Sequence, residues 1–401
     1  MKPEQIQSLI RQYPTPMYAF DIGTLRKRVR YLKDALPKGV EICYAVKANN
    51  FIIKELIDDV DRFEICSPGE AYVCQRLEVP EEKMVISGVY KTPEFIEELA
   101  ANHPNVGIYT VESMEHFRLL RHCSEAYGKK LPVLLRLTSG NQFGLDESDL
   151  RQIVRDHAEE LDIKGIQYYS GTQKHSMKKL KRELEHLDEL MQSLQAEYGF
   201  VTRELEFGPG FQVCYFQGEE YDEDGFLAEF SQLLEQMQYQ TKITLEMGRA
   251  IAASCGTYLT RVVDRKVNKK QNYAIVDGGI HHLVYFGQSM AMKHPVYQVL
   301  PERESTEDEF WNLCGSLCTV NDILVKQLPV KNLQVGDVFA FENTGAYCMI
   351  EGISLFLSRE LPRVVLMKED GDTILVRNEV ATDTINTPNY ERKQRNDGRT
   401  D

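Results

Sequence analysis

Between residues 40 and 250 the sequence alternates between short apolar, β-branched runs and longer amphipathic stretches. There are eight such runs: EICYAV (41–46), RFEIC (62–66), KMVIS (83–87), VGIYTV (106–111), PVLLRL (132–137), IKGIQYY (163–169), LEFG (205–208) and KITLEM (242–247). Strands that alternate with helices indicate a parallel sheet. Eight strand–helix units in roughly 210 residues favour a closed (β/α)8 barrel, with an open doubly wound sheet as the alternative.

The stretches between the runs carry apolar residues at helical spacing. The predicted helices cover 51–60, 69–77, 92–103, 113–128, 146–161, 177–199 and 221–238. Ser113 opens the fourth of them and is a preferred N-cap residue. The pattern therefore predicts helices packed around the barrel strands.

The remainder of the chain has a different pattern. From about residue 256 the strand-like runs are short and are interrupted by Gly, Pro, Asn and Asp, which is typical of an antiparallel β-sandwich or barrel. The N-terminal segment TPMYAFD (15–21) is also strand-like, and we expect it to join that domain. The predicted division is a barrel over 22–253, a β domain over 1–21 and 254–383, and a polar tail over 384–401.

Composition excludes several classes of protein. The net charge of −14 argues against a nucleic-acid binder, which would carry a basic excess. No run approaches 18 apolar residues and the N-terminus lacks an apolar signal core, so no membrane segment is expected. The nine cysteines are scattered and form no CxxC pair, which predicts a cytoplasmic protein with reduced thiols and no metal site.

A lysine ends the first predicted strand. Catalytic groups of such barrels lie where strands end and loops begin. Lys47 stands there, directly after an apolar run. A buried ammonium is costly unless it is solvated, paired or covalently engaged, and such a lysine can act as a nucleophile or form a Schiff base. An exposed loop lysine is the alternative.

Other strand ends carry groups that suit a phosphate. They are Ser67 and Glu70, Arg136, Tyr169–Thr172, Gly208–Phe211 and Glu246–Arg249. Glycine turns, hydroxyls and a guanidinium can bind a phosphate dianion, although a Gly-x-Gly is also common in ordinary tight turns. A carboxylate such as Glu246 would keep a pyridine nitrogen protonated if the cofactor were pyridoxal 5′-phosphate (PLP).

Seven motifs occur in an order that carries a resemblance. They are YAVKAN, CSPGE, LEFGPGF, EMGR, VDGG, GSLCTVND and ENTGAY. Together they resemble the ornithine/diaminopimelate decarboxylase family, which are PLP enzymes with an alanine-racemase-like fold. The resemblance covers roughly residues 12–370. The stretches at 169–173, 279–282 and 318–319 look most like the branch that decarboxylates a glutamyl unit carried on an acyl-carrier protein in butirosin assembly.

The resemblance implies a role for each matching residue. Lys47 would hold PLP as a Schiff base, Glu246 would pair with the pyridine nitrogen, and Arg136 would approach the 3-oxygen of the ring. The phosphate would be bound by Gly208, Gly210, Gly248, Arg249, Thr172 and Tyr347. The family's active site is shared across a homodimer, so Cys318, Thr319 and Asp322 would reach the substrate from the other subunit. Cys318 would protonate the carbanion left by CO2, although a cysteine is more often a small buried apolar residue.

Four positions depart from the family pattern. Tyr169 replaces the histidine that stacks on the PLP ring, although its aromatic ring can still stack there and bind the cofactor, and Gln167 replaces a second histidine. Pro209 removes one N–H from the phosphate turn. Thr319 stands where diaminopimelate enzymes have an acidic residue, and the loop after Arg136 is short. These departures argue against diaminopimelate and also disfavour lysine and ornithine, and they leave a modified or carrier-linked amino acid as one option for the substrate.

The leading hypothesis is PLP-dependent decarboxylation through the Lys47 Schiff base and a quinonoid intermediate stabilised by Glu246. One alternative is an amino-acid racemase of the same fold; alanine racemases place an arginine at the pyridine nitrogen, so the carboxylate of Glu246 discriminates against it. The other alternative is a regulatory relative that has lost PLP and does no catalysis.

Substitution of the lysine distinguishes an enzyme from such a regulator. The wild-type protein should show the absorbance band of PLP bound as a Schiff base, and Lys47→Ala should lack it, because no other group forms that bond. Absorption spectra of the two purified proteins check this. A colourless wild-type protein that binds no PLP would favour the regulator.

Overall fold

The chain forms two compact units in a computed structural model that describes residues 1–303 and 309–389. The barrel unit comprises Ile22–Cys214 and Gly218–Cys255. The β unit comprises Met1–Asp21, Tyr215–Gln217 and the part of the chain that follows Gly256. Each unit is described by itself below. Most of the predicted tail, from residue 390 onward, lies outside the described residues.

The barrel unit contains a closed barrel of eight parallel strands. They are β2 (Glu41–Ala45), β3 (Arg62–Ile65), β4 (Met84–Ile86), β5 (Ile108–Val111), β6 (Pro132–Leu137), β7 (Asp162–Tyr169), β8 (Glu204–Gly208) and β9 (Lys242–Met247). Strand β9 closes the barrel by pairing with β2, where Cys43 lies opposite Glu246. All eight predicted runs form strands, so the closed barrel is confirmed and the open sheet is wrong.

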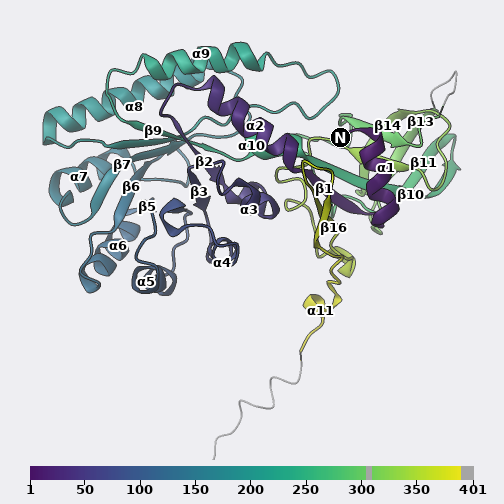
Figure 1. The fold of residues 1–401 in the computed structure, drawn as a ribbon, viewed down its shortest axis with the longest axis horizontal. Helices are drawn as coiled ribbons and strands as arrows, with labels where there is room; N and C mark the ends of the chain where they lie inside the picture. The colour runs from purple at the N-terminus through teal and green to yellow at the C-terminus, as the bar shows by residue number, and fades with distance from the viewer. Residues whose placement is uncertain (304–308, 390–401) are drawn as a thin grey trace, which may run out of the picture. The chain divides into compact units, whose positions relative to one another are not determined.

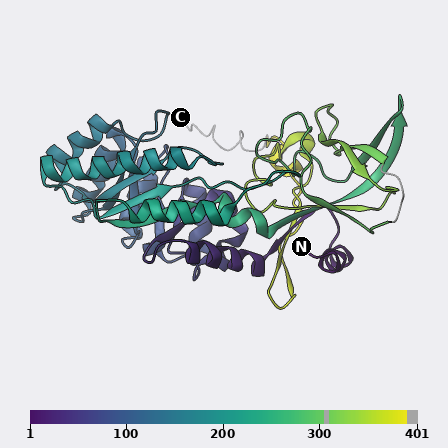
Figure 2. The ribbon, with the colours of Figure 1, turned by 90° about the horizontal axis from the view of Figure 1, so that it is seen from above.

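Helices surround these strands on the outside of the barrel (Figure 1). They are α2 (Ile22–Ala35), α3 (Ile53–Leu56), α4 (Pro68–Arg76), α5 (Pro93–Asn102), α6 (Met114–Ala126), α7 (Glu147–His157), α8 (Met177–Tyr198), α9 (Glu223–Glu235) and α10 (Arg249–Ala252). Helices α8 and α9 lie side by side in both views (Figures 1 and 2). Ser113 caps α6 as predicted, because its hydroxyl accepts a hydrogen bond from the backbone N–H of His116.

The helix predicted over 51–60 is wrong in extent. The chain there forms a 3₁₀ turn at Asn50–Ile52 and only one α-helical turn, α3. The Asn49 side chain accepts from the N–H of Phe51 at 2.9 Å and starts the 3₁₀ turn. The chain must then reach β3, and Asp61 is already tied to Ile42 by two hydrogen bonds. The connection is therefore too short for a longer helix.

The β unit is built on a mixed sheet. Its strands are β1 (Met17–Asp21), β10 (Gly256–Asn268), β11 (Gln271–Val276), β12 (Tyr297–Leu300), β13 (Glu309–Cys314), β14 (Ile323–Val330), β15 (Val338–Phe341), β16 (Arg363–Met367) and β17 (Thr373–Arg377). The N-terminal strand β1 joins this sheet, as expected, between β10 and β16. Most pairs are antiparallel, but β1–β16 and β11–β13 are parallel, which the sequence did not predict.

The β unit also contains two short α-helices. Helix α1 (Pro3–Gln12) was missed because the N-terminal segment is mostly polar, yet its Ile6 and Leu9 are three apart and are both buried against the sheet. Helix α11 (Asp383–Asn386) follows the last strand. Among the described residues no helix is long and apolar enough to cross a membrane.

Gly165 is a sensitive point of the barrel. It pairs with Glu204 across β7 and β8, and a Cβ added at 165 would lie 1.8 Å from the Glu204 carbonyl oxygen. Because the clashing atoms belong to the backbone of the neighbouring barrel strand, Gly165→Ala should lower the free energy of unfolding by about 3 kcal/mol. Gly69→Ala in α4 is the control: its Cβ would meet nothing nearer than 3.8 Å, and it should stabilise the helix by up to about 1 kcal/mol. Urea unfolding of the two variants checks this, and equal midpoints would contradict it.

Candidate active site

Lys47 lies at the carboxyl end of the barrel, on a single 3₁₀ turn, Val46–Ala48, that follows β2. Its Nζ is 3.4 Å from Glu246 Oε1 and 3.6 Å from Cys66 Sγ, and it is in direct contact with a carboxylate oxygen of Glu64. The lysine side chain is 37% exposed, whereas Glu64 and Glu246 are buried. Lys47 is therefore a paired lysine at the mouth of the barrel.

The two carboxylates beside Lys47 have opposite pKa shifts. Burial and the negative charge of Glu64 raise the pKa of Glu246 to about 7, against the opposing charge of Lys47. Burial also acts to raise the pKa of Glu64, but the charge and hydrogen bond of Lys47 outweigh it and bring that pKa to about 2. Glu64 is thus the ionised partner of Lys47, while Glu246 can hold or release a proton near neutral pH.

Arg136, at the end of β6, is fixed by a buried carboxylate. Its Nη1 lies 3.2 Å from Glu112 Oε2, and its guanidinium lies 4.9 Å from the ring centroid of Phe143. Glu112 also lies 3.7 Å from the ammonium of Lys91, whose pKa burial lowers to about 8. Neither Glu112 nor Lys91 was predicted. Arg136 is therefore held in one orientation by the loops that follow β4 and β5.

The loops after β7, β8 and β9 come together at the predicted phosphate site. Arg249 Nε donates to Thr172 Oγ1 at 3.3 Å, which joins the third loop to the first. Gly210 has a φ of 61°, and a Cβ there would lie 2.1 Å from the Gly171 carbonyl oxygen. A Cβ at Gly208 would lie 2.4 Å from the ring of Tyr169. The loops can approach this closely only because positions 208 and 210 carry no side chain.

A second group of carboxylates lies deeper in the barrel. Glu206 is fully buried, and its Oε1 accepts from the amide of Gln167 at 2.6 Å. Its Oε2 has no hydrogen-bond partner among the described residues, although Arg62 lies 3.9 Å away and also binds Glu204. Burial and the charge of Glu246 raise the pKa of Glu206 to about 8. Glu206 is therefore a neutral acid at pH 7.

The remaining predicted residues belong to the β unit. All nine cysteines are free and lie in the described part of the chain, and Cys318 is the one that is exposed. The turn that carries it is held by Asp322, which accepts from the backbone N–H of Leu317 at 2.7 Å and of Ile280 at 2.9 Å. Thr319 is half-buried on the same turn. Asp322 thus positions the Cys318 turn within its own subunit.

Tyr347 has an unusual backbone conformation. Its φ is 66°, in the left-handed region that non-glycine residues seldom occupy. Its carbonyl accepts from the N–H groups of Ile350 and Glu351, at 2.9 and 3.0 Å, which stabilises this conformation. A strained residue held in this way is often a functional one.

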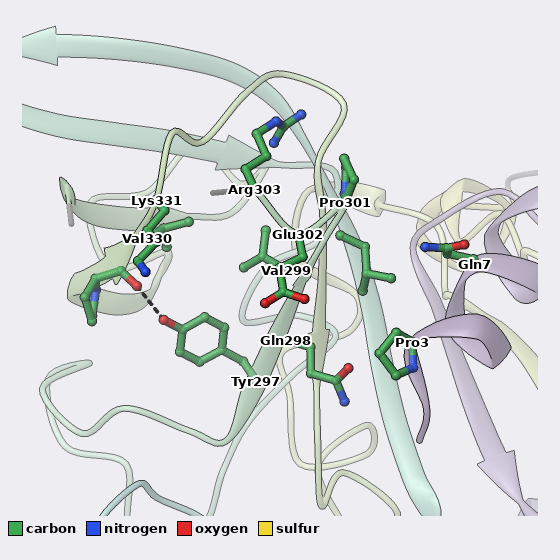
Figure 3. A pocket seen from close by; sticks show the side chains of 12 residues that line it. Pro3, Gln7, Tyr297, Gln298, Val299, Pro301, Glu302, Arg303, Val330 and Lys331 are labelled. Atoms are coloured by element: carbon green, nitrogen blue, oxygen red, sulfur yellow. Dashed lines mark hydrogen bonds between the residues drawn. The ribbon is translucent and has the colours of Figure 1, made fainter. Parts of the chain in front are cut away.

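The hollow drawn in Figure 3 lies elsewhere in the β unit. It is bordered by α1, by β12 and by the segment that follows β14. The hydroxyl of Tyr297 donates to the carbonyl of Pro329 at 2.6 Å, and Arg303 is paired with Asp337 (Figure 3 labels Tyr297 and Arg303). None of the predicted site residues lines it.

Residues 22–253 match the sequence model of the family described as "Pyridoxal-dependent decarboxylase, pyridoxal binding domain". The chain belongs to this family. This decarboxylase is 28% identical to the L-glutamyl-[BtrI acyl-carrier protein] decarboxylase of Niallia circulans, over 95% of each chain. It is 26% identical to the diaminopimelate decarboxylase of Aquifex aeolicus, over 96% of this chain and 94% of that protein.

A solved structure shows the same fold. Diaminopimelate decarboxylase from Helicobacter pylori, complexed with L-lysine, superposes with a TM-score of 0.83 at 23% identity, covering 95% of this chain and 98% of the other. The family match over residues 22–253 and the similarity to named decarboxylases confirm the resemblance to the ornithine/diaminopimelate decarboxylase family and the dependence of this decarboxylase on PLP.

The donor set of the barrel suits that cofactor. Lys47 offers an amine next to two carboxylates, and Glu246, with a pKa of about 7, can share a proton with a ring nitrogen. Arg249, Thr172 and the side-chain-free turn at Gly210 provide a cation, a hydroxyl and open backbone for a phosphate. The residues therefore fit PLP.

Two neighbours of Lys47 escaped the analysis of the sequence. Glu64 and Cys66 lie on and just after β3, before the predicted strand-end residues Ser67 and Glu70. A signal was present, because a glutamate inside the apolar run RFEIC is costly unless it is paired. The alternation of a strand also directs residue 64 and residue 66 to the same side.

The raised pKa of Glu206 predicts a pH dependence of stability. The pKa lies at about 8 in the folded protein against an ordinary value of 4.5. Between these two pH values the folded protein keeps the Glu206 proton and the unfolded chain has released it. For the apoprotein, the contribution of Glu206 to the free energy of unfolding should fall as pH rises from 5 to 8, by at most about 1.4 kcal/mol per pH unit.

Removing this group should flatten the dependence. Glu206→Gln cannot titrate, so its unfolding free energy should fall less steeply over this range than that of the wild-type apoprotein. Glu185→Gln, exposed on α8, is the control and should keep the wild-type slope. Urea unfolding at pH 5, 6, 7 and 8 measures both, and equal slopes for Glu206→Gln and wild type would contradict the assignment.

Proposed function

We propose that this decarboxylase removes CO2 from an amino acid whose far end is modified or linked to a carrier protein, with Lys47, Glu246 and Cys318 as catalytic residues. The observation that carries the proposal is the contact of Lys47 with Glu64 and Glu246 at the carboxyl end of the barrel. This contact places an amine that can form a Schiff base beside a carboxyl that can exchange a proton near neutral pH.

Each residue of the barrel unit has a distinct task. Bound PLP supplies an electron sink for the pair left on Cα when CO2 departs. Lys47 would form the covalent link to the cofactor and yield it to the substrate amine. Glu246 would keep a proton at the ring nitrogen, which its raised pKa permits. Arg249 and Thr172, already hydrogen-bonded to each other, would bind the phosphate.

The substrate's far end is inferred from the departures and the relatives. Thr319 offers no charge to a distal ammonium, which disfavours lysine, ornithine and diaminopimelate. The relative from Niallia circulans is named for a glutamyl group on an acyl-carrier protein, and its similarity extends over 95% of both chains. A neutral thioester or amide at the far end suits a hydroxyl such as that of Thr319 better than an ammonium does.

Cys318 would return a proton to Cα. It is an exposed thiol on a turn that Asp322 fixes through two backbone hydrogen bonds. We propose that it acts from the second subunit of a homodimer, so that each active site is completed by Cys318 and Thr319 of the other copy. The nine free thiols support a cytoplasmic location.

A substrate screen tests the proposed function. We expect CO2 release from an L-glutamyl-loaded acyl-carrier protein, with kcat/KM at least about 100-fold above that for free diaminopimelate, lysine or ornithine, because those leave a charge opposite Thr319 without a partner. Lys47→Ala is the negative control. Inversion of the substrate without CO2 release would instead indicate a racemase, and preference for diaminopimelate would refute the carrier-linked substrate.

A further inference from the structure

The loops after β7 and β8 are hydrogen-bonded to each other. The N–H of Lys174 donates to the carbonyl of Gly210 at 2.8 Å, and Lys174 forms a parallel bridge with Phe211. The Gln173 side-chain amide forms two hydrogen bonds with the Val213 backbone. Its Nε2 donates to the Val213 carbonyl at 2.9 Å, and its Oε1 accepts from the Val213 N–H at 2.7 Å. The position of one loop therefore determines the position of the other.

The side chain of Lys174 also connects these two loops to helix α8. Its Nζ lies 2.8 Å from Glu183 Oε2 on α8 and 3.4 Å from the carbonyl oxygen of Gly208, and it lies 5.4 Å from the centroid of the Phe207 ring. The second oxygen of Glu183 accepts from Ser170 Oγ at 2.5 Å. Lys174 and Glu183 are 3% and 7% exposed, so helix α8 is joined to both loops by a buried ion pair.

This ion pair is not explained by stability or by direct binding. Buried ion pairs often contribute little to the free energy of folding, because the loss of hydration offsets the attraction. Lys174 is also a poor phosphate ligand, since its charge is already balanced by Glu183 and burial lowers its pKa. What the pair does achieve is to fix the carbonyl of Gly208 relative to α8.

Pro209 makes the placement of this turn important. It contributes no N–H, so the phosphate must rely on the remaining donors of the turn. Gly210, in its left-handed conformation, packs with no spare room against Gly171. A small displacement of the turn would therefore move the remaining backbone donors away from the phosphate.

We propose that Lys174, Glu183 and Ser170 are positioning residues that hold the turn Gly208–Gly210 where it binds the cofactor phosphate. The inference rests on the proposed function, in which this turn and Arg249 bind the phosphate of PLP. The three residues do not touch the cofactor themselves. Their effect should therefore appear in the affinity for the phosphate group and not in the affinity for the pyridine ring.

The test compares PLP with pyridoxal, which lacks the phosphate. The variant is Lys174→Met/Glu183→Leu, which replaces both charges by apolar groups of similar size and so leaves no unpaired charge in the interior. The matched control is Lys181→Met/Glu185→Leu, an exposed lysine–glutamate pair on the same helix. Dissociation constants for both ligands are measured by absorbance titration of the apoproteins, whose melting temperatures are recorded alongside.

We expect the dissociation constant of PLP to rise roughly tenfold in the buried-pair variant, as for the loss of one charge-assisted hydrogen bond, with that of pyridoxal unchanged. Ser170→Ala, a milder change should the double variant fold poorly, should weaken PLP about threefold with the same selectivity. The control pair should change neither constant.

Two results would overturn the inference. Equal weakening of PLP and pyridoxal would mean that the ion pair supports the whole site and not the turn, and unchanged affinity for both would mean that it positions nothing. A wild-type protein that binds PLP no more tightly than pyridoxal would instead contradict the proposed phosphate site. The wild-type measurement thus separates failure of the proposed function from failure of this inference.

Discussion

The contact of one ammonium with two buried carboxylates is the interaction on which the chemistry of this protein depends. Lys47 and Glu246 are 199 residues apart, and they meet because β9 closes the barrel against β2. In an open doubly wound sheet the first and last strands are not neighbours. Closure of the barrel is therefore what creates the site, and the charges of Glu64 and Lys47 then give the two carboxylates different protonation states.

The interior of the barrel below the site is also polar. Arg62, Glu204, Glu206 and Gln167 occupy positions that a barrel usually fills with branched apolar side chains. Such groups are tolerated because each is hydrogen-bonded or ion-paired on at least one side. The charge of Glu246 contributes to the raised pKa of Glu206, so the protonation of the mouth and of the core of the barrel are linked.

The sequence predicted the barrel well because its signal is local and repeated. Each strand is an apolar run, and residues at strand ends share one face whatever the details of the loops. That reasoning predicted that one end of the barrel carries Lys47, Glu246, Thr172, Gly210 and Arg249. It did not single out Glu64. The place of that glutamate inside an apolar strand indicated a paired carboxylate, but its partner depends on where the Lys47 side chain reaches.

The β unit was harder to predict for a related reason. Strand pairing there is between distant segments, such as β1 with β16, and nothing in either run specifies a parallel partner. The extent of the helix after Asn49 was likewise set by a tertiary hydrogen bond at Asp61 and not by its own apolar spacing. The ion pair of Lys174 and Glu183 is similar, because eight residues of loop and helix separate two groups that only the fold makes neighbours.

The exposure of Cys318 has a practical consequence for chemical modification. The other eight thiols are wholly or partly shielded, and burial raises the pKa of several of them, including Cys43, Cys66 and Cys74. Electrophiles react with the thiolate form of an accessible cysteine. A brief treatment with a thiol-selective reagent would thus modify the subunit mainly at Cys318, the residue proposed to return the proton to Cα.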